Sequence, residues 1–270
     1  MSNQKVVLIT GSSSGVGKST ARLLSQKGYR VFGTSRDPAG AEAIPTVKLL
    51  ALDVQSDASV AACVKAVVNE AGRIDVLVNN AAYELAGALE EISIEEAKAQ
   101  FETNFFGVIR MVNAVLPSMR QQNHGQIVNV SSLSGLSSIP FMGIYSASKF
   151  ALEGYTEALR MELRPFNIHV SLTEAGFLKT PMMNKRQVPT GQLKEYDPWR
   201  QRAFNAIRNH EQKAPGPELV SQEILRIIAS KAPRLRYPIG AQAKFTTRLQ
   251  RFLPEGAYEW GKRSTFRLDK

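Results

Sequence analysis

Short apolar runs alternate with helical patterns through the first 130 residues, and this alternation constrains the fold more than any other feature of the chain. The apolar runs have the length of strands and cover 6–10, 30–34, 47–52, 74–79 and 126–131. Helical patterns between them cover 16–28, 57–71 and 95–120. Strands that alternate with helices are joined by right-handed crossovers, which produce a parallel sheet covered on both faces. We therefore predict an α/β fold with a single doubly wound parallel sheet.

The second half continues this pattern and shows no linker between domains. A helix is predicted over 145–164, a strand over 168–173, a helix over 218–230 and a short strand over 237–239. Residues 176–217 differ, because prolines punctuate a stretch rich in Met and aromatic residues. Such a segment is typical of a lid over a binding site. We expect one domain over 1–240 that includes a lid at 176–217, with a basic extension over 241–270 packed on it.

The stretch TGSSSGVGKST at 10–20 follows the first predicted strand and has the composition of a phosphate-binding loop. A P-loop requires G-x-x-x-x-G-K-[ST], but Ser12 stands where the first glycine of that motif would be. The spacing G-x-x-x-G-x-G instead suits a dinucleotide. Gly11 allows the turn, Gly15 lets the backbone approach a pyrophosphate, and Gly17 allows close packing of helix on strand. The hydroxyl groups of Ser13 and Ser14 lie in the same loop.

The end of the second strand indicates which dinucleotide is bound. This position holds an acid in proteins that bind the ribose 2′-hydroxyl of NAD, and a basic residue in proteins that bind the 2′-phosphate of NADP. Ser35 and Arg36 suit the phosphate, whereas Asp37 could serve NAD or pair with Arg36. We favour NADP(H) over NAD(H) and leave NAD(H) as the alternative. Asp53, which follows the third strand, is either an adenine contact or a strand-end cap.

Tyr145 and Lys149 lie one helical turn apart, so they share one face of the predicted helix. An ammonium near a phenol favours phenolate, and we expect the pKa of Tyr145 to fall below its usual value of about 10. Tyr145 can then act as general acid or base at a carbonyl. Ser132, at the end of the fifth strand, can donate a hydrogen bond to the developing oxyanion.

The glycine loop, Asp53, the NNAA stretch at 79–82, Asn104, Ser132 and the YSASK stretch at 145–149 resemble the short-chain dehydrogenase/reductase family in order and spacing. The resemblance covers about 5–240 and implies a Rossmann fold. It implies that Asn104, Ser132, Tyr145 and Lys149 are catalytic, that Asn104 anchors a relay water and that Lys149 holds the nicotinamide ribose. The expected cofactor-binding set is Gly11, Ser13, Ser14, Gly15, Val16, Gly17, Ser35, Arg36, Asp53, Val54, Asn80, Ala81, Ala82, Tyr145, Lys149, Gly176, Phe177 and Thr180.

Two positions depart from the family pattern. Ala82 replaces the glycine of NNAG, and Ala175 replaces the proline of a PG turn. Both departures concern the local geometry around the cofactor, because neither removes a catalytic group.

The resemblance predicts an NADP(H)-dependent oxidoreductase that transfers a hydride between the nicotinamide and a carbonyl or secondary alcohol. The expected pocket is apolar, as in the hydroxysteroid and retinol dehydrogenase branches of carbonyl reductases. Its expected lining is Leu133, Phe141, Met142, Met182, Met183 and Trp199. The alternatives are a catalytically silent NADP-binding sensor or scaffold, and a membrane-associated member that uses the basic C-terminal tail.

Charge and cysteine content limit the partners. Ten Lys or Arg and three acidic residues fall within 231–270, and 244–253 reads as a short basic amphipathic helix. We expect this helix to pack on the protein body; peripheral membrane contact is the less favoured interpretation, and no nucleic-acid-binding motif accompanies it. One cysteine and three scattered histidines predict no disulfide and no metal site. We expect a cytoplasmic protein, and the family resemblance implies a homodimer or homotetramer that is paired through the helices that contain 101–120 and 145–164.

Overall fold

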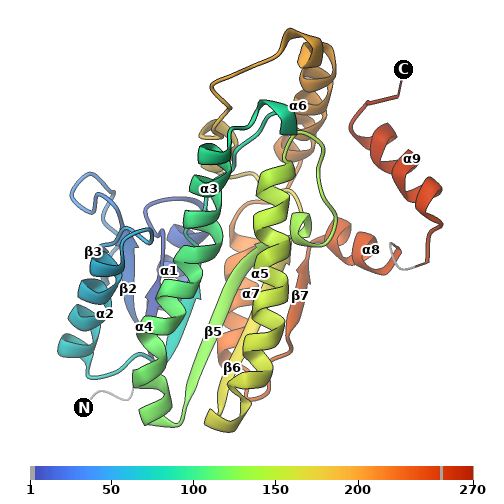
Figure 1. Cartoon of the computed structure of the whole chain (residues 1–270). Coiled ribbons are helices and arrows are strands. Elements are labelled where there is room, and N and C mark those ends of the chain that lie inside the picture. Colours follow the sequence, from blue (N-terminus) through green and yellow to red (C-terminus); the bar gives the residue numbers. More distant parts are fainter. Residues whose placement is uncertain (1–3, 250–251, 270) are drawn as a thin grey trace.

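A seven-stranded parallel sheet forms the centre of the protein (Figure 1). The computed structural model describes residues 4–249 and 252–269. The strand order is β3-β2-β1-β4-β5-β6-β7, and every neighbouring pair is parallel. The strands are β1 (Val6–Ile9), β2 (Arg30–Ser35), β3 (Val47–Ala51), β4 (Val76–Asn79), β5 (Gly125–Ser132), β6 (Ile168–Ala175) and β7 (Arg236–Ile239). The chain order reverses between β1 and β4, which confirms the doubly wound sheet.

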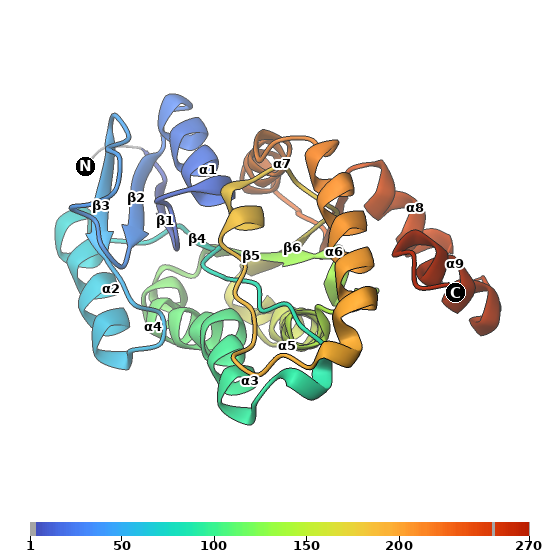
Figure 2. The same ribbon diagram turned by 90° about the horizontal axis from the view of Figure 1, so that it is seen from above.

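Helices cover both faces of this sheet (Figure 2). One face carries α1 (Gly15–Gln26) and α7 (Glu218–Ala229). The other face carries α2 (Asp57–Ala71), α4 (Gly107–Gln122) and α5 (Gly143–Glu162). Successive residues of β1 point to opposite faces, because Leu8 packs in the core below α2, α4 and α5 while Val7 and Ile9 pack below α1 and α7. Burial on both sides explains why the strands read as continuous apolar runs.

The helix expected over 95–120 is not continuous. The structure has α3 (Ile94–Phe101), a π-helical turn at Glu102–Phe106 and then α4. A π turn accommodates one extra residue, and such turns are frequent at functional sites. Apolar spacing does not reveal this insertion, since the helical pattern resumes directly after it. The turn directs the buried Asn104 inward.

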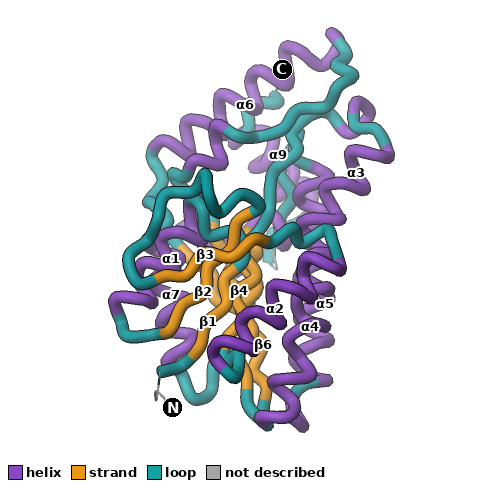
Figure 3. The backbone as a smooth tube through the Cα atoms, turned by 90° about the vertical axis from the view of Figure 1, so that its left-hand side faces the viewer, coloured by secondary structure: helices purple, strands orange, loops and turns teal. Residues whose placement is uncertain are grey.

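The segment 176–217 folds over the carboxyl ends of the strands (Figures 1 and 3). It contains the short 3₁₀ turns Pro181–Asn184 and Lys194–Tyr196, followed by helix α6 (Asp197–Gln212). The sequence analysis missed α6, although Ala203, Ala206 and Ile207 form its buried stripe. The prolines that indicated a lid lie mostly outside this helix, so they concealed a regular element within the segment.

The C-terminal residues form two helices at the edge of the molecule (Figure 2). These are α8 (Ala241–Leu249) and α9 (Glu255–Thr265). The expected basic helix at 244–253 thus overlaps α8, and residues 250–251 lie outside the described part. Phe266 is buried against Ile207 and Met142, so the extension packs on the same body. Within 4–249 and 252–269, none of the helices is long and apolar enough to span a membrane.

Close packing at Gly17 generates a prediction about stability. A Cβ at this position would lie 2.2 Å from the Gly11 backbone oxygen and 2.5 Å from Asn80 Nδ2. We expect Gly17→Ala to lower the free energy of unfolding by about 1–3 kcal/mol or more, because backbone atoms must move to make room. Urea unfolding followed by circular dichroism measures this.

Gly261→Ala in α9 is the matched control, since its Cβ would meet no atom within 4 Å. Alanine is the better helix former, so this variant should be as stable as the wild type or slightly more stable. Equal stability of the two variants would contradict the packing argument.

Candidate active site

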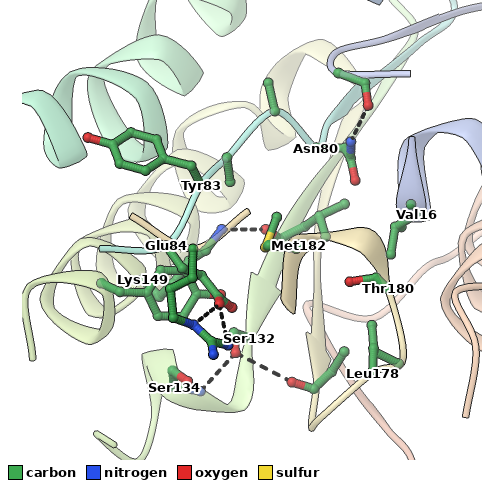
Figure 4. A pocket seen from close by; sticks show the side chains of 18 of the residues that line it. Val16, Asn80, Tyr83, Glu84, Ser132, Ser134, Lys149, Leu178, Thr180 and Met182 are labelled. Carbon is green, nitrogen blue, oxygen red and sulfur yellow. Dashed lines mark hydrogen bonds and ion pairs between the residues drawn. The ribbon is translucent and has the colours of Figure 1, made fainter. Parts of the chain in front are cut away.

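A cavity of about 770 Å³ lies at the carboxyl ends of the strands (Figure 4). Loops that follow β1 to β6 all contribute to its lining. Parallel strands direct their carboxyl ends to one edge of a sheet, so residues from distant parts of the chain meet there. The described residues hold no group of His, Cys, Asp or Glu side chains arranged to bind a metal ion.

The glycine loop opens one end of this cavity. Gly11 and Gly15 have φ angles of +69° and +55°, which favour glycine. Both line the cavity, with Ser13, Ser14 and Val16. Gly17 lies beneath the loop and outside the lining, where it packs against Gly11. Lys18, which occupies the position of a P-loop lysine next to Gly17, lies on α1 and forms an ion pair with Glu42.

Hydrogen bonds join the glycine loop to the end of β4. The Thr10 hydroxyl accepts from the backbone N–H groups of Asn80 (2.9 Å) and Ala81 (3.0 Å). The Asn80 amide donates to the backbone oxygens of Thr10 and Gly11, both at 2.9 Å. These four bonds hold the crevice between β1 and β4 in shape, and Asn80, Ala81 and Ala82 line it.

The end of β2 presents Arg36 and Asp37 to the same cavity. The Asp37 carboxylate accepts a hydrogen bond from the Gly40 N–H group at 3.0 Å, which stabilises the loop over 37–40 that follows β2. Arg36 is exposed, and its guanidinium makes no ion pair with the described residues. The Asp53 carboxylate accepts a hydrogen bond from the Gln55 N–H group at 3.0 Å, as a strand-end cap does, and Asp53 lines the cavity. Its contact with adenine stays a prediction.

The other residues expected to bind a cofactor also reach this cavity. They are Ser35, Val54, Gly176, Phe177 and Thr180.

Tyr145, Ser132 and Lys149 meet at the base of the cavity. Tyr145 is only 7% exposed and Lys149 only 4%. The Ser132 hydroxyl accepts from the Ser134 N–H group at 3.1 Å and donates to the Ala175 oxygen at 3.5 Å, bonds that are drawn in Figure 4. Lys149 Nζ lies 5.9 Å from the centre of the Tyr145 ring and donates to the Val130 oxygen at 2.9 Å.

The protonation of these groups differs from the expectation. Burial raises the pKa of Tyr145, Glu84 raises it further, and the hydrogen bond with Ser132 and the charge of Arg186 only partly oppose this. The predicted lowering of the Tyr145 pKa is therefore wrong for this state of the protein, because desolvation of the phenolate outweighs the nearby ammonium. Burial also lowers the pKa of Lys149 to about 8, against the opposing charges of Glu153 and Glu84.

Asn104 is 1% exposed and does not line the cavity. Its amide accepts from the Tyr83 N–H group at 3.1 Å and donates to the Tyr83 oxygen at 3.0 Å and to Ser148 Oγ at 3.2 Å. The side chain thus positions the segment after β4 against α5. The water-anchoring role that the resemblance implied stays a prediction.

The family model "short chain dehydrogenase" matches residues 5–190. The chain belongs to the short-chain dehydrogenase/reductase family. Its relatives include 3-ketodihydrosphingosine reductase of Bacteroides thetaiotaomicron, 44% identical over 87% of this chain and 88% of that protein. Retinol dehydrogenase 8 of Bos taurus is 40% identical over 86% of this chain and 80% of that protein. This short-chain dehydrogenase/reductase is accordingly an oxidoreductase that acts on CH–OH or C=O groups.

Solved structures agree with the fold. A short-chain dehydrogenase from Streptomyces avermitilis has a TM-score of 0.83 at 31% identity, over 98% of both chains. ElxO with bound NADP has a TM-score of 0.72 at 27% identity, over 86% of this chain and 94% of that one. A family member from Burkholderia phymatum in complex with NAD has a TM-score of 0.75 at 29% identity, over 92% of this chain and 93% of that one. The fold binds nicotinamide cofactors of both kinds.

The part of the cavity around Leu133, Met142, Met182, Met183 and Arg186, which we call the substrate half, differs in part from the expectation. Leu133, Met142, Met182 and Met183 line the cavity as expected. Phe141 and Trp199 instead line a second cavity with Tyr196 and Arg263. Phe141, in the loop before α5, packs edge-on against Tyr196 and Phe204, and Trp199 lies in the first turn of α6. Five charged residues of the lining were not predicted from the sequence: Glu84, Lys185, Arg186, Glu211 and Lys262. The spacing of these residues in the sequence does not indicate that they line the cavity. Only Glu84 could have been found, because it lies shortly after the NNAA stretch.

The role of Thr10 can be tested by removing its hydroxyl group. We expect Thr10→Val to lower the free energy of unfolding by at least about 1 kcal/mol, because two backbone N–H groups lose their acceptor. It should also weaken binding of NADPH, measured by its fluorescence enhancement. Thr10→Ser keeps the acceptor and should resemble the wild type in both measurements; equal behaviour of Val and Ser variants would overturn this assignment.

Proposed function

We propose that the protein is an NADP(H)-dependent oxidoreductase that transfers a hydride between the nicotinamide and a carbonyl or secondary alcohol, with Tyr145 as general acid and base. The observation that carries this proposal is the meeting of Tyr145, Ser132 and Lys149 in a cavity that also reaches the glycine loop. One end of the cavity suits a pyrophosphate and the other a reacting carbonyl. Bound NADPH supplies the hydride.

Side chains of this protein donate and accept the proton that accompanies hydride transfer. Burial and the charge of Glu84 keep the Tyr145 hydroxyl protonated in the absence of ligands, which suits a proton donor for carbonyl reduction. The Ser132 hydroxyl lies near enough to the phenol to lower the pKa of Tyr145, and it can donate to the same substrate oxygen. Lys149, with a pKa of about 8, stands close enough to the ring to favour the phenolate once the proton has left.

Arg36 supports the choice of NADP. Its guanidinium is exposed at the cavity and makes no ion pair with the described residues, while the Asp37 carboxylate is occupied by the Gly40 N–H group. A free guanidinium can bind a 2′-phosphate through two hydrogen bonds. Asp37 would have to give up its loop contact to receive a ribose hydroxyl.

The substrate that we propose has a large apolar part. Leu133, Met142, Met182 and Met183 provide an apolar and adaptable wall beside the catalytic groups. The names of two relatives, a 3-ketodihydrosphingosine reductase and a retinol dehydrogenase, support the same class of molecule.

We further propose a cytoplasmic homo-oligomer. Phe106 and Phe150, on the π turn and on α5, are 42% and 46% exposed, which favours association through these helices. The single cysteine, Cys63, is free and buried, as is common in reducing compartments.

The first prediction from this proposal concerns Tyr145→Phe. Loss of the hydroxyl removes the proton donor, so we expect turnover of an apolar ketone to fall by at least about 100-fold. Binding of NADPH should be retained. Tyr155→Phe is the control, because it removes a hydroxyl from the same helix outside the cavity. Substantial residual turnover in Tyr145→Phe would refute the assignment of the donor.

The second prediction concerns cofactor choice. Arg36→Ala should raise the Kd for NADPH by roughly 10-fold or more and leave that for NADH nearly unchanged, because a charge-assisted hydrogen bond is lost only with the phosphate. Asp37→Ala should not weaken the binding of NADPH. Isothermal titration gives the Kd of each cofactor for the wild type and for both variants. An equal rise of both Kd values in Arg36→Ala would favour NAD as the cofactor.

A further inference from the structure

Three charged side chains form a cluster in the substrate half of the cavity. Arg186 Nε donates to Glu84 Oε2 at 2.8 Å, and Arg186 Nη2 donates to Glu211 Oε1 at 2.6 Å. The side chains of Arg186 and Glu84 are each 13% exposed, and that of Glu211 is 7% exposed. Burying two carboxylates and one guanidinium costs free energy, because the loss of their hydration offsets much of their attraction.

Backbone pairing between the lid and the body places this cluster. The Gln187 N–H group donates to the Glu84 oxygen at 2.8 Å, and the Ala86 N–H group donates to the Gln187 oxygen at 2.9 Å. This short parallel bridge brings Arg186 beside Glu84. Glu211 comes from the last turn of α6. The cluster therefore exists only when the lid lies on the body.

Glu84 acts on the catalytic groups more strongly than its partner Arg186. Its charge raises the pKa values of both Tyr145 and Lys149, and the opposing effect of Arg186 on Tyr145 is the smaller one. Figure 4 draws Glu84 among the lining side chains with Ser132 and Lys149. A carboxylate in this position hinders a general base, since it disfavours the phenolate.

The other cations of the substrate half have contacts of their own or face solvent. Lys149 donates to the Val130 oxygen, and Lys262 donates to the Ser138 oxygen at 2.8 Å. Lys185 is exposed. The two carboxylates thus share one guanidinium, and the pKa of Glu211 is raised by burial despite its ion pair. The cluster therefore has one more acidic than basic side chain, and all three line the same cavity as Tyr145 and Ser132.

We propose that Glu84 binds a protonated amino group on the carbon next to the reacting carbonyl, so that the substrates are long-chain α-amino ketones and the corresponding amino alcohols. This proposal rests on the function proposed above and names its substrate class. The apolar chain lies along the methionines of the lid. Arg186 is a positioning residue, because it holds the Glu84 carboxylate and ties it to α6.

Substrate binding then assists the reaction. The ammonium neutralises Glu84, which removes the charge that opposes the Tyr145 phenolate. The pKa of Tyr145 is therefore lower in the complex with an amino alcohol than with an uncharged alcohol. A ketone or alcohol without the amino group lacks this effect.

The test compares a long-chain α-amino ketone with its N-acetyl derivative and with the unsubstituted ketone of equal length. Rates of NADPH oxidation are measured below the pKa of the amine. We expect kcat/KM of the wild type for the amino ketone to exceed that for the other two by at least about 10-fold, as a charge-assisted hydrogen bond implies. In Glu84→Gln this ratio should fall toward one. Glu195→Gln, which removes an exposed carboxylate outside the cavity, should retain the wild-type ratio.

A second measurement separates recognition from a purely structural role. In the oxidation direction, the rate should rise with pH as Tyr145 loses its proton. This rising limb should lie at lower pH for the amino alcohol than for the uncharged alcohol, and the difference should vanish in Glu84→Gln. Wild-type ratios near one, or a ratio unchanged by Glu84→Gln, would overturn the proposal, even if that variant is less stable. Absence of turnover with every ketone would instead contradict the proposed function.

Discussion

The hydrogen bonds between Thr10 and the segment after β4 are the contacts on which the rest of the site depends. They join the first strand to the fourth at the point where the chain order of the sheet reverses. They extend the pairing of β1 with β4 beyond the strands, to the glycine loop and the segment that leads to Glu84. The Asn80 amide adds the reverse contact, and the absence of a side chain at Gly17 lets helix α1 approach closely enough for both. One crevice is thereby shaped for a dinucleotide.

Burial has opposite consequences for the two titrating groups of the site. It raises the pKa of Tyr145 and lowers that of Lys149, so both groups are driven toward their neutral forms. A neutral phenol is a competent donor for reduction, whereas oxidation requires a change that favours the phenolate. The carboxylate of Glu84 makes the need for that change greater. In the mechanism that we propose, the charges of the bound cofactor and substrate supply this change, so proton transfer depends on which substrate is bound.

The sequence was sufficient to predict the sheet, because strands buried on both faces are read directly from continuous apolar runs such as 6–10 and 74–79. It also located the glycine loop, Arg36 and the Tyr145–Lys149 pair, since each depends on local spacing. The π turn at Glu102–Phe106 could not be seen, because it shifts the helical phase by one residue only. The Glu84–Arg186–Glu211 cluster depends on contacts 102 and 25 residues apart, which no local pattern encodes. Phe141 and Trp199 were misplaced for the same reason, because the orientation of α6 and the packing of Phe141 against Tyr196 and Phe204 are tertiary properties.

Hydride transfer from NADPH to a carbonyl can be followed with NADPH deuterated at the transferable position of nicotinamide C4, incubated with the enzyme and an apolar or α-amino ketone. Mass spectrometry of the product should find a single deuterium on the new carbinol carbon. Recovery of unchanged ketone from an enzyme that binds NADPH would contradict the account and favour a silent sensor.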